Sequence, residues 1–479
     1  MRIGIVHGYF LGDSGSGIYV SQLARELARQ GHDVTLACQE QHPDIYDYID
    51  SAYAFDGDGP MLLFQQPKKY AGSCRLVRPA LEGELLTYVK GEFAPFKSCT
   101  FQDASTAQIT RFVDSNINAL TAAFDKWPQD MVQANHVIMQ PYEVRKAVGE
   151  KTPYCVTVHG SALNFSVAKD PRMTPYFVEG LSGARSVVSL SRDMAEQVKS
   201  AASKAGLDIE DRVEVIPPGV ESDQFAPVVD RDSVLKSVAP DMIPKGREII
   251  LFAGRLIWTK GLQYAVAAMP LVLSERPGAQ LFIAGGGPLM APLKKIVLVL
   301  QQGNIRRARQ LTEESMQIES LEEYGPVIPE MGREESEAYI AAASDLSHHV
   351  RFLGQVPHAE IPPLMGVSDL MIAPSVFPEA YGLVMIEALA GGAVPLGTYQ
   401  SGLMDAADIV AGELGDEEFK SLLPGAGLTK GIAARVLSLL EKYPTRDPAF
   451  RERLHDLATR RFSWSVVAEK YSDLGLPGC

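Results

Sequence analysis

The chain has 479 residues, of which 46% are hydrophobic and 22% are charged, and its formal net charge is −14. This length exceeds one ordinary hydrophobic core, so we expect two or three domains, and the composition excludes a largely disordered chain. The negative charge argues against nucleic acid or an anionic membrane as a partner of the whole surface, although a local basic cleft is compatible with it.

The cysteines and the first residues indicate the cellular setting. The chain begins with a short strand pattern instead of a signal peptide, and no apolar run approaches the about 20 residues that span a bilayer. The cysteines are scattered and form no C-x-x-C pair, which favours free thiols in a reducing compartment. They are Cys38, Cys74, Cys99, Cys155 and Cys479. We therefore expect a cytoplasmic protein with at most peripheral membrane contact.

The first part of the chain alternates between predicted strands and helices. A buried strand at Ile3–Val6 leads into a glycine-rich loop at Leu11–Gly17, and an amphipathic helix follows at Ile18–Gln30. Residues 39–110 are less regular and hard to assign. Later elements in this part are helices at Arg111–Trp127 and Met194–Ala205 and strands at Asp33–Cys38, Met131–Val137, Tyr154–Val158, Ser186–Leu190 and Val213–Ile216.

A second alternating series follows a polar, proline-containing stretch from Glu221 to Lys245, which is the best linker candidate. Its strands are predicted at Glu248–Ala253, Ala279–Ala284, Val350–Gly354, Leu370–Ala373 and Val394–Leu396, and its helices at Gly261–Glu275 and Leu383–Ala390. Two such series predict an α/β protein of two doubly wound, Rossmann-like domains that face a cleft. We place these domains at 1–225 and 226–460.

One stretch of the second series, 291–348, is far longer than an ordinary connection between strands. It contains an arginine cluster at Ile305–Gln310 and a run of glutamates from Glu313 to Glu323. Such charge patterns favour a pair of extra, solvated helices. A lid or a partner surface is the sharper alternative.

The segment with the clearest chemistry begins at Glu379 and ends at Glu387, with Gly382 between the two acids. An apolar strand leads in and an apolar helix follows, so Gly382 stands where that helix begins. Helix N-termini bind phosphate through free N–H groups and the helix dipole. Carboxylates beside such an end suit sugar hydroxyls. The segment therefore predicts a site for a ligand that is both a phosphate and a polyol.

Two cations strengthen this prediction. Arg255 and Lys260 follow the strand at Glu248–Ala253 and precede the next helix. The carboxyl ends of parallel strands are where open α/β sheets bind their ligands. A diphosphate needs charges of this kind, because Arg offers a planar fork and Lys a point charge. Alone, the two cations are compatible with ordinary surface ion pairs, but together with the acidic segment they favour a diphosphate site.

Other motifs are weaker. The glycine loop lacks the third glycine of a G-x-G-x-x-G fingerprint, and a nicotinamide-dependent oxidoreductase stays an alternative that this imperfect match does not favour. Glu379 and Glu387 are also compatible with the acid pair of a glycoside hydrolase. His159 ends a predicted strand beside Gly160 and is expected to face the cleft; His7, Asn135 and His136 occupy similar positions as lining residues. No cluster of metal ligands is evident.

In their order and spacing these motifs resemble the retaining glycosyltransferases of GT-B fold known as family 4, or glycosyl transferases group 1. The resemblance covers nearly the whole chain, and each motif is weak by itself. It is carried by Gly15-Ser16-Gly17, Gly31-His32-Asp33-Val34, Val158-His159-Gly160, Val215-Ile216-Pro217-Pro218-Gly219-Val220, Gly254-Arg255-Leu256, Lys260-Gly261, Gly285-Gly286-Gly287-Pro288, Phe352-Leu353-Gly354 and the segment from Glu379 to Glu387.

The resemblance implies a hexosyltransferase whose first domain holds the acceptor and whose second domain holds a nucleoside diphosphate sugar. The final helix, within 461–479, would pack back on the first domain. The roles that it implies are a catalytic set of His159, Arg255, Lys260 and Glu379, a donor-binding set of Gly17, Arg255, Lys260, Glu379, Ala380, Tyr381, Gly382, Leu383 and Glu387, and acceptor contacts from Asn135 and His136.

Within the donor set, Arg255 and Lys260 would hold the diphosphate, Glu387 the ribose hydroxyls and Glu379 the transferred sugar. No metal or cofactor is required, because two cations already face the diphosphate. UDP is the expected nucleotide by frequency among similar proteins, and GDP or ADP stay open. The chain departs from the family at Ser16, in residues 396–405 and in the long 291–348 stretch. An epimerase, a nucleotide-sugar hydrolase or a non-catalytic sensor on the same fold stays an alternative.

Overall fold

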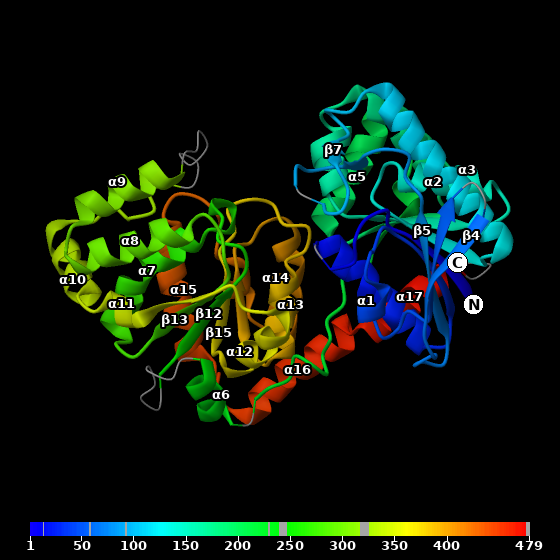
Figure 1. The fold of residues 1–479 in the computed structure, drawn as a ribbon. Coiled ribbons are helices and arrows are strands. Elements are labelled where there is room, and N and C mark those ends of the chain that lie inside the picture. Colours follow the sequence, from blue (N-terminus) through cyan, green and yellow to red (C-terminus); the bar gives the residue numbers. More distant parts are fainter. Residues whose placement is uncertain are drawn as a thin grey trace. The chain divides into compact units, whose positions relative to one another are not determined.

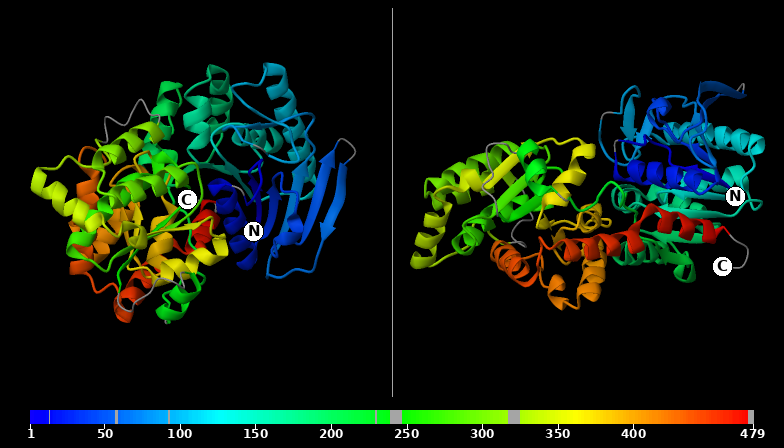
Figure 2. Two further views of the ribbon diagram at one scale, coloured as in Figure 1. Left: turned by 60° about the vertical axis from the view of Figure 1, so that its left-hand side comes forward. Right: turned by 90° about the horizontal axis from the view of Figure 1, so that it is seen from below.

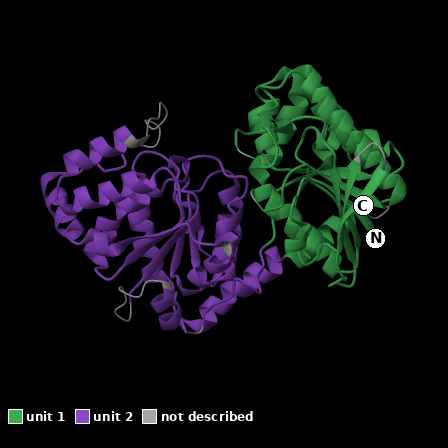
Figure 3. Ribbon diagram, in the orientation of Figure 1, with its two compact units in different colours: residues 1–219, 464–479 green, residues 220–463 purple. Residues whose placement is uncertain are grey.

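The structure is a computed structural model, which describes residues 1–12, 14–56, 59–91, 93–228, 230–238, 247–316 and 325–475. The chain divides into two compact units (Figures 1 and 3). The first contains Met1–Gly219 and the segment from Trp464, and the second contains Val220–Ser463. The predicted boundary after residue 225 differs from this division by a few residues.

The first unit is built on a nine-stranded sheet within the described residues, in the order β11-β10-β9-β8-β1-β2-β5-β3-β4. Neighbouring strands are parallel, except that β4 runs antiparallel to β3 at the edge. The strands are β1 (Arg2–Val6), β2 (Asp33–Ala37), β3 (Ser51–Asp56), β4 (Gly59–Gln65), β5 (Ser73–Pro79), β8 (Met131–Asn135), β9 (Tyr154–Val158), β10 (Ser186–Ser189) and β11 (Val213–Val215). β6 (Leu85–Thr87) and β7 (Ser98–Thr100) form a separate parallel pair.

Helices cover both faces of this sheet (Figures 1 and 2). They are α1 (Gly15–Arg29), α2 (Thr106–Lys126), α3 (Gln140–Val148), α4 (Thr174–Ser182), α5 (Arg192–Lys204) and α17 (Trp464–Leu474). Local sequence starts three of them: the Ser14 hydroxyl caps α1, the Ser191 hydroxyl caps α5, and Ser105 with Gln108 forms a capping box at α2. α17 belongs to the first unit, where it packs against α1.

The prediction missed most of the order within 39–110. Three strands of the large sheet and both strands of the small sheet lie there. Their pattern is hard to recognise because β5 carries Arg75, Arg78 and Pro79, and because β4 exposes Met61 and Leu62. These strands are also out of chain order, since β5 pairs with β2 and β3 lies outside β5. Sequence periodicity therefore indicates neither the pairing nor the burial.

The second unit contains a parallel five-stranded sheet in the order β14-β13-β12-β15-β16. Its strands are β12 (Ile249–Ala253), β13 (Gln280–Ala284), β14 (Val350–Gly354), β15 (Leu370–Ala373) and β16 (Val394–Gly397). Its helices are α6 (Arg231–Val238), α7 (Leu262–Glu275), α8 (Met290–Gln301), α9 (Ile305–Met316), α10 (Arg333–Ala343), α11 (Leu346–His349), α12 (Ile361–Val367), α13 (Leu383–Ala390), α14 (Ser401–Leu414), α15 (Leu428–Lys442) and α16 (Pro448–Phe462). The alternation predicted for this part of the chain is confirmed.

The long stretch at 291–348 is helical where it is described. It contains most of α8, all of α9 and α10, and α11 except its last residue, while most of the glutamate run lies outside the described residues. Tyr339 of α10 is buried, and its hydroxyl donates to the carbonyl of Ala267 in α7 at 2.8 Å. The stretch is therefore packed onto the body of the second unit through an apolar side and is more than a solvated appendage.

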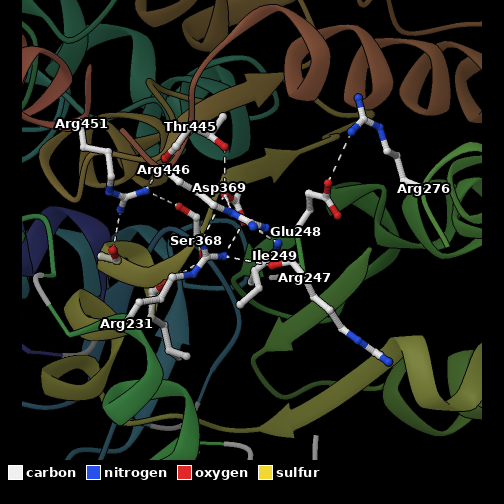
Figure 4. A network of polar contacts seen from close by, with 12 residues as sticks. Arg231, Arg247, Glu248, Ile249, Arg276, Ser368, Asp369, Thr445, Arg446 and Arg451 are labelled. Atoms are coloured by element: carbon white, nitrogen blue, oxygen red, sulfur yellow. Dashed lines mark hydrogen bonds and ion pairs between the residues drawn. The ribbon is translucent and has the colours of Figure 1, made fainter. Parts of the chain in front are cut away.

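A buried charge network holds the amino end of β15 (Figure 4). Asp369 is fully buried and accepts hydrogen bonds from Arg231 of α6, the amide of Ile249, Thr445 and Arg446. Arg451 of α16 lies beside it and donates to four backbone carbonyls, those of Gly366, Ser368, Gly391 and Thr445. The network joins the sheet to three segments that are distant in sequence.

Candidate active site

The loops that carry the predicted charged site residues lie at the carboxyl edge of the five-stranded sheet. β12 and β15 are adjacent parallel strands, with Leu251 beside Met371. Arg255 and Lys260 follow β12, and the segment that begins at Glu379 follows β15. The shared edge that the sequence predicted is therefore present within the second unit.

Glycines let these loops approach one another closely. Gly261 has φ +69°, and a Cβ at this position would lie 1.8 Å from the carbonyl oxygen of Pro374 after β15. Gly285, after β13, has φ +155°, and its Cβ would lie 1.8 Å from the carbonyl oxygen of Gly254. Only glycine tolerates such contacts, because any side chain would collide with backbone. The glycines thus fix the loops of three neighbouring strands around one point.

A direct ion pair joins the two charged segments. Lys260 Nζ lies 2.6 Å from Glu379 Oε1, and both side chains are half-buried. The Ser375 hydroxyl donates to the same carboxylate oxygen at 2.6 Å. The pair holds a cation and an anion side by side at the sheet edge. An arriving polyanion would compete with Glu379 for Lys260 and would free the carboxylate to accept hydroxyl groups.

Arg255 lies in the same loop cluster but is exposed. Within the described part of the chain no carboxylate forms an ion pair with it. Its guanidinium therefore keeps its donors available for a ligand, and a planar fork of N–H groups matches phosphate oxygens well.

Helix α13 begins beside this pair. Gly382 precedes its first residue, Leu383, and adopts the left-handed conformation with φ +83°. A Cβ at Gly382 would also lie 2.3 Å from Leu403 Cδ2 of α14. Ala380 and Tyr381 lead into this turn, and the Tyr381 side chain is buried, so its ring does not reach a ligand at the surface. The free amides of the helix start, with its dipole, form a phosphate-sized positive end.

We expect Gly382→Ala to weaken nucleotide binding about tenfold, because alanine strains the left-handed turn and shifts the first amides of α13. Calorimetric titration with UDP measures this loss. Gly412→Ala is a matched control: Gly412 lies within α14, has no positive φ and has open space around its Cβ position. The control variant should bind as the unmodified protein does, and equal affinity of both variants would contradict the role of the turn.

Glu387 lies one turn into α13 and is half-buried. Burial raises the pKa of its carboxyl to about 7. A carboxyl with this pKa changes its protonation near neutral pH. Hydrogen bonds from hydroxyl donors would stabilise its ionised form. The contact of Glu387 with ribose hydroxyls stays a prediction, and the buried carboxyl is chemically suited to it.

Sequence reasoning missed several polar residues that complete the site. They follow β16, the neighbour of β15: the Ser401 hydroxyl accepts from the Glu379 amide at 2.8 Å, and Thr398 donates to the Ser375 carbonyl at 2.6 Å. Gly402 packs against the carbonyl of Ala380. Their position after a strand of the same parallel sheet could have indicated that Thr398 and Ser401 lie near the site. In this stretch serine and threonine hydroxyls support the loop that carries Glu379.

In the first unit, His159 lies directly after β9. Its Nε2 lies 2.8 Å from Oδ1 of Asn135, and the ring of Tyr19 contacts it edge-on at 5.3 Å between centroids. Burial, together with the nearby His7, lowers the pKa of His159 to about 3, so the ring is neutral at physiological pH. A neutral imidazole at a strand end offers one donor and one acceptor but no charge.

The other predicted residues of this unit are less accessible than expected. His7 and His136 stack at 5.5 Å and are buried, and burial lowers the pKa of both rings. Asn135 is also fully buried with both polar atoms bonded, which does not support the predicted direct contact with an acceptor. The Gly17 amide donates to Ser14 Oγ, the cap of α1, at 3.0 Å, so this amide already has a partner within the chain.

Comparison with known families covers both units. Residues 14–219 match the glycosyl transferase 4-like domain, and residues 236–306 and 325–418 match the glycosyl transferases group 1 domain. The chain belongs to the group 1 glycosyltransferases. The matched ranges include Arg255, Lys260 and Glu379 in the second unit and His159 in the first.

Curated relatives of this glycosyltransferase align over parts of their length. An uncharacterised glycosyltransferase of Methanocaldococcus jannaschii is 25% identical over 259 residues, which are 53% of this chain and 54% of the relative. Phosphatidyl-myo-inositol mannosyltransferase of Mycobacterium leprae is 34% identical over 143 residues, 29% of this chain and 35% of that protein. The chain thus spans about half or less of the length of these relatives.

Solved structures show the fold over the whole chain. Sucrose-phosphate synthase from Thermosynechococcus elongatus aligns with a TM-score of 0.61 and 19% identity, covering 99% of this chain and 98% of that one. HepE of Anabaena aligns with a TM-score of 0.59 and 16% identity, covering 99% of each chain. The predicted GT-B fold of two Rossmann-like domains is confirmed. Among the described residues, no helix combines the length and apolar character that crossing a membrane requires.

Proposed function

We propose that this protein transfers a sugar from a nucleoside diphosphate sugar to an acceptor hydroxyl with retention of configuration. The observation that carries this proposal is the arrangement at one sheet edge of Arg255, the Lys260–Glu379 pair and the N-terminal turn of α13. Cations and a helix start suit a diphosphate, and a carboxylate beside them suits the hydroxyls of a sugar. The family membership supports a glycosyl transfer over other reactions of such a donor.

The difficult event in this reaction is departure of the nucleoside diphosphate, because negative charge develops on its phosphate oxygen. Arg255, Lys260 and the amides after Gly382 would stabilise that charge from three directions. Groups that are already in place when charge develops contribute several kcal/mol each, about 2.7–4 for one well-placed donor. These groups supply positive charge without a metal ion, so the proposal includes no resident metal or cofactor.

The proposed transfer proceeds on one face of the sugar. The bond from the anomeric carbon to the phosphate oxygen breaks as the bond to the acceptor oxygen forms, and the departing phosphate takes the proton of the acceptor hydroxyl. Glu379, the carboxylate nearest the proposed diphosphate, is bound to Lys260 and Ser375. It therefore suits hydroxyl binding better than attack as a nucleophile. Retention follows from this same-face course.

UDP is the proposed nucleotide. Similar structures support it, since HepE of Anabaena is in complex with UDP and with UDP-glucose, and a trehalose-6-phosphate protein of E. coli is bound with UDP-2-fluoro glucose. A starch synthase of Arabidopsis thaliana is bound to ADP, so ADP stays the alternative nucleotide. A cytoplasmic location, where nucleotide sugars are made available to transferases, is part of the proposal.

A panel of UDP, GDP, ADP and dTDP in a thermal-shift assay tests donor binding, and a screen of nucleotide sugars with mass spectrometry tests transfer. Retention is read from the anomeric proton coupling of the product by NMR. Release of free sugar from donor without acceptor would indicate a hydrolase, and conversion of the donor itself would indicate an epimerase. Absence of a thermal shift with all four nucleotides would refute the proposal.

The pH dependence of donor binding follows from Glu387. With its pKa raised to about 7, the carboxyl is protonated below neutrality and accepts fewer hydrogen bonds from a ribose. Affinity should therefore be full above this pKa and fall about tenfold between about pH 8 and about pH 6. An intact nucleotide sugar is the titrant, because its diphosphate does not change charge in this range. Glu387→Gln should bind the donor more weakly at pH 8, and its affinity should not change with pH. If the affinity of both proteins changed with pH in the same way, a group other than Glu387 would be responsible.

A further inference from the structure

Six side chains of the first unit form a closed ring of contacts behind the end of β9. His159 bonds to Asn135 of β8, whose Nδ2 donates to Oε1 of Gln133 at 3.1 Å. Nε2 of Gln133 donates to the Thr157 hydroxyl at 2.7 Å, and Thr157 shares a hydrogen bond of 2.7 Å with the hydroxyl of Tyr471. Tyr19 closes the ring, since its hydroxyl donates to Tyr471 at 2.9 Å and its ring edge meets His159.

The ring is buried except at His159. Gln133, Asn135, Thr157, Tyr19 and Tyr471 are all at most 2% exposed. Burial raises the pKa of both Tyr19 and Tyr471, so their hydroxyls stay protonated. Buried polar networks whose members are bonded are rigid, because breaking any link leaves a desolvated polar atom. Such a ring restricts the movement of the one member that reaches the sheet edge.

The ring also assigns the proton on His159. The Asn135 amide nitrogen donates to the carbonyl of Val6 at 3.1 Å, and a carbonyl only accepts. The oxygen of Asn135 therefore faces His159, and the His159 Nε2 must carry the hydrogen. Nδ1 is then the unprotonated nitrogen, with a lone pair for a donor hydroxyl. Asn135 thus selects one tautomer and one ring orientation.

One member of the ring comes from the last helix. Tyr471 lies on α17. The first residue of that helix, Trp464, also contacts Tyr19, at 5.2 Å between ring centroids. Residues 471 and 157 are far apart in sequence, and Thr157 itself is the β9 residue two positions before His159. The packing of α17 on the first unit is therefore linked to the side chain of His159 through the Tyr471 and Thr157 hydroxyls and the side-chain amides of Gln133 and Asn135.

We propose that Asn135, supported by Gln133, Thr157 and Tyr471, is a positioning residue that presents His159 with Nδ1 as an acceptor for a substrate hydroxyl. This inference rests on the proposed function, because it assumes that His159 meets the substrate. It assigns Asn135 a role behind the substrate in place of direct acceptor contact. It also gives α17 a part in the active site beyond covering the sheet.

The first test is spectroscopic and requires no activity. In protein labelled with ¹⁵N-histidine, His159→Gln identifies the signals of His159. Those signals should show a neutral ring with the hydrogen on Nε2, and its exchange with solvent should be slow. Asn135→Leu should accelerate that exchange, and Tyr471→Phe should do so to a smaller degree. A hydrogen on Nδ1 in the unmodified protein would overturn the assignment.

The second test separates positioning from folding. Asn135→Leu should lower kcat about 100-fold and Tyr471→Phe about tenfold, as expected for a catalytic group that is misoriented, with little change in the KM of the nucleotide sugar. Tyr154→Phe is the matched control, because Tyr154 is also buried in this unit and its hydroxyl donates to the Gly180 carbonyl at 2.6 Å outside the ring. Should Asn135→Leu fail to fold, Tyr471→Phe and Thr157→Val carry the test.

The outcomes distinguish the two proposals. If all ring variants turn over as fast as Tyr154→Phe, the positioning role is wrong even though the transferase proposal stands. If the unmodified protein transfers no sugar, the proposed function fails, and the tautomer measurement still reports whether Asn135 controls His159.

Discussion

Replacing Lys260 with methionine should lower kcat/KM for the nucleotide sugar about 100- to 1000-fold, which is the usual loss when one preorganised charge-stabilising donor is removed. The fold should persist, because the Lys260 side chain is 33% exposed and ends a single 3-10 turn, Trp258–Lys260, between β12 and α7. Methionine preserves the length of the side chain, so the lost positive charge is the main change. Steady-state kinetics with the donor identified by the screen, and circular dichroism of both proteins, measure the two effects.

Lys260→Met also leaves Glu379 without its cation, and the uncompensated carboxylate should repel the diphosphate. The double variant Lys260→Met/Glu379→Gln removes this repulsion, so it should recover part of the UDP affinity measured by calorimetry without recovering turnover. Lys430→Met is the control, because it breaks an exposed ion pair with Glu335 in the same unit. Exposed pairs contribute little, so this variant should behave as the unmodified protein. Normal turnover by Lys260→Met would remove Lys260 from the mechanism.

The sequence predicted the second unit better than the first for a physical reason. Its parallel strands are short, apolar and separated by helices, so periodicity alone located β14, β15 and α13 with the bounds that the structure has. In 39–110 of the first unit, strand identity depends on partners elsewhere in the chain. β5 becomes a strand because β2 offers it an edge, and no local pattern carries that information.

The candidate site shows the same division. Charged residues at strand ends, such as Arg255 and Glu379, were evident because the carboxyl edge of a parallel sheet collects whatever follows its strands. The contacts of Ser375 and Ser401 with Glu379 were not evident, since hydroxyl groups are common in loops and their bonds form only after folding. Asn135 was noticed for its position, but only its hydrogen bonds show that it faces His159 and the backbone of β1.

Replacing Asp369 with alanine should produce the largest loss of stability, about 3–5 kcal/mol in the free energy of unfolding of the second unit. The carboxylate is fully buried, and its removal leaves Arg231, Arg446 and the amide of Ile249 without their acceptor. Urea denaturation followed by circular dichroism measures the loss. Glu337→Ala is the control, because Glu337 pairs with Arg333 on the surface, where both side chains are well exposed, and its loss should cost about 0.5 kcal/mol or less.

The loss of stability caused by Asp369→Ala should become smaller as the pH falls. Burial alone would raise the pKa of Asp369, but the hydrogen bond and charge of Arg231, the charge of Arg446 and the Ile249 amide outweigh it and hold the pKa below the ordinary value. A carboxyl with a lowered pKa stabilises the folded state above its unfolded pKa, and this contribution is lost as the pH falls through the folded one. The difference between the two proteins should therefore be full at neutral pH and shrink in acid, and a difference that grows in acid would contradict the assignment.

Stability and turnover should separate in this variant because they depend on opposite ends of one strand. Asp369 precedes β15, whereas Ser375 and Glu379 follow it at the carboxyl edge. Below its unfolding transition, Asp369→Ala should therefore keep a kcat close to that of the unmodified protein, while Lys260→Met keeps its stability and loses turnover. A strong loss of kcat in folded Asp369→Ala would show instead that the charge network reaches through β15 to the loop that carries Glu379.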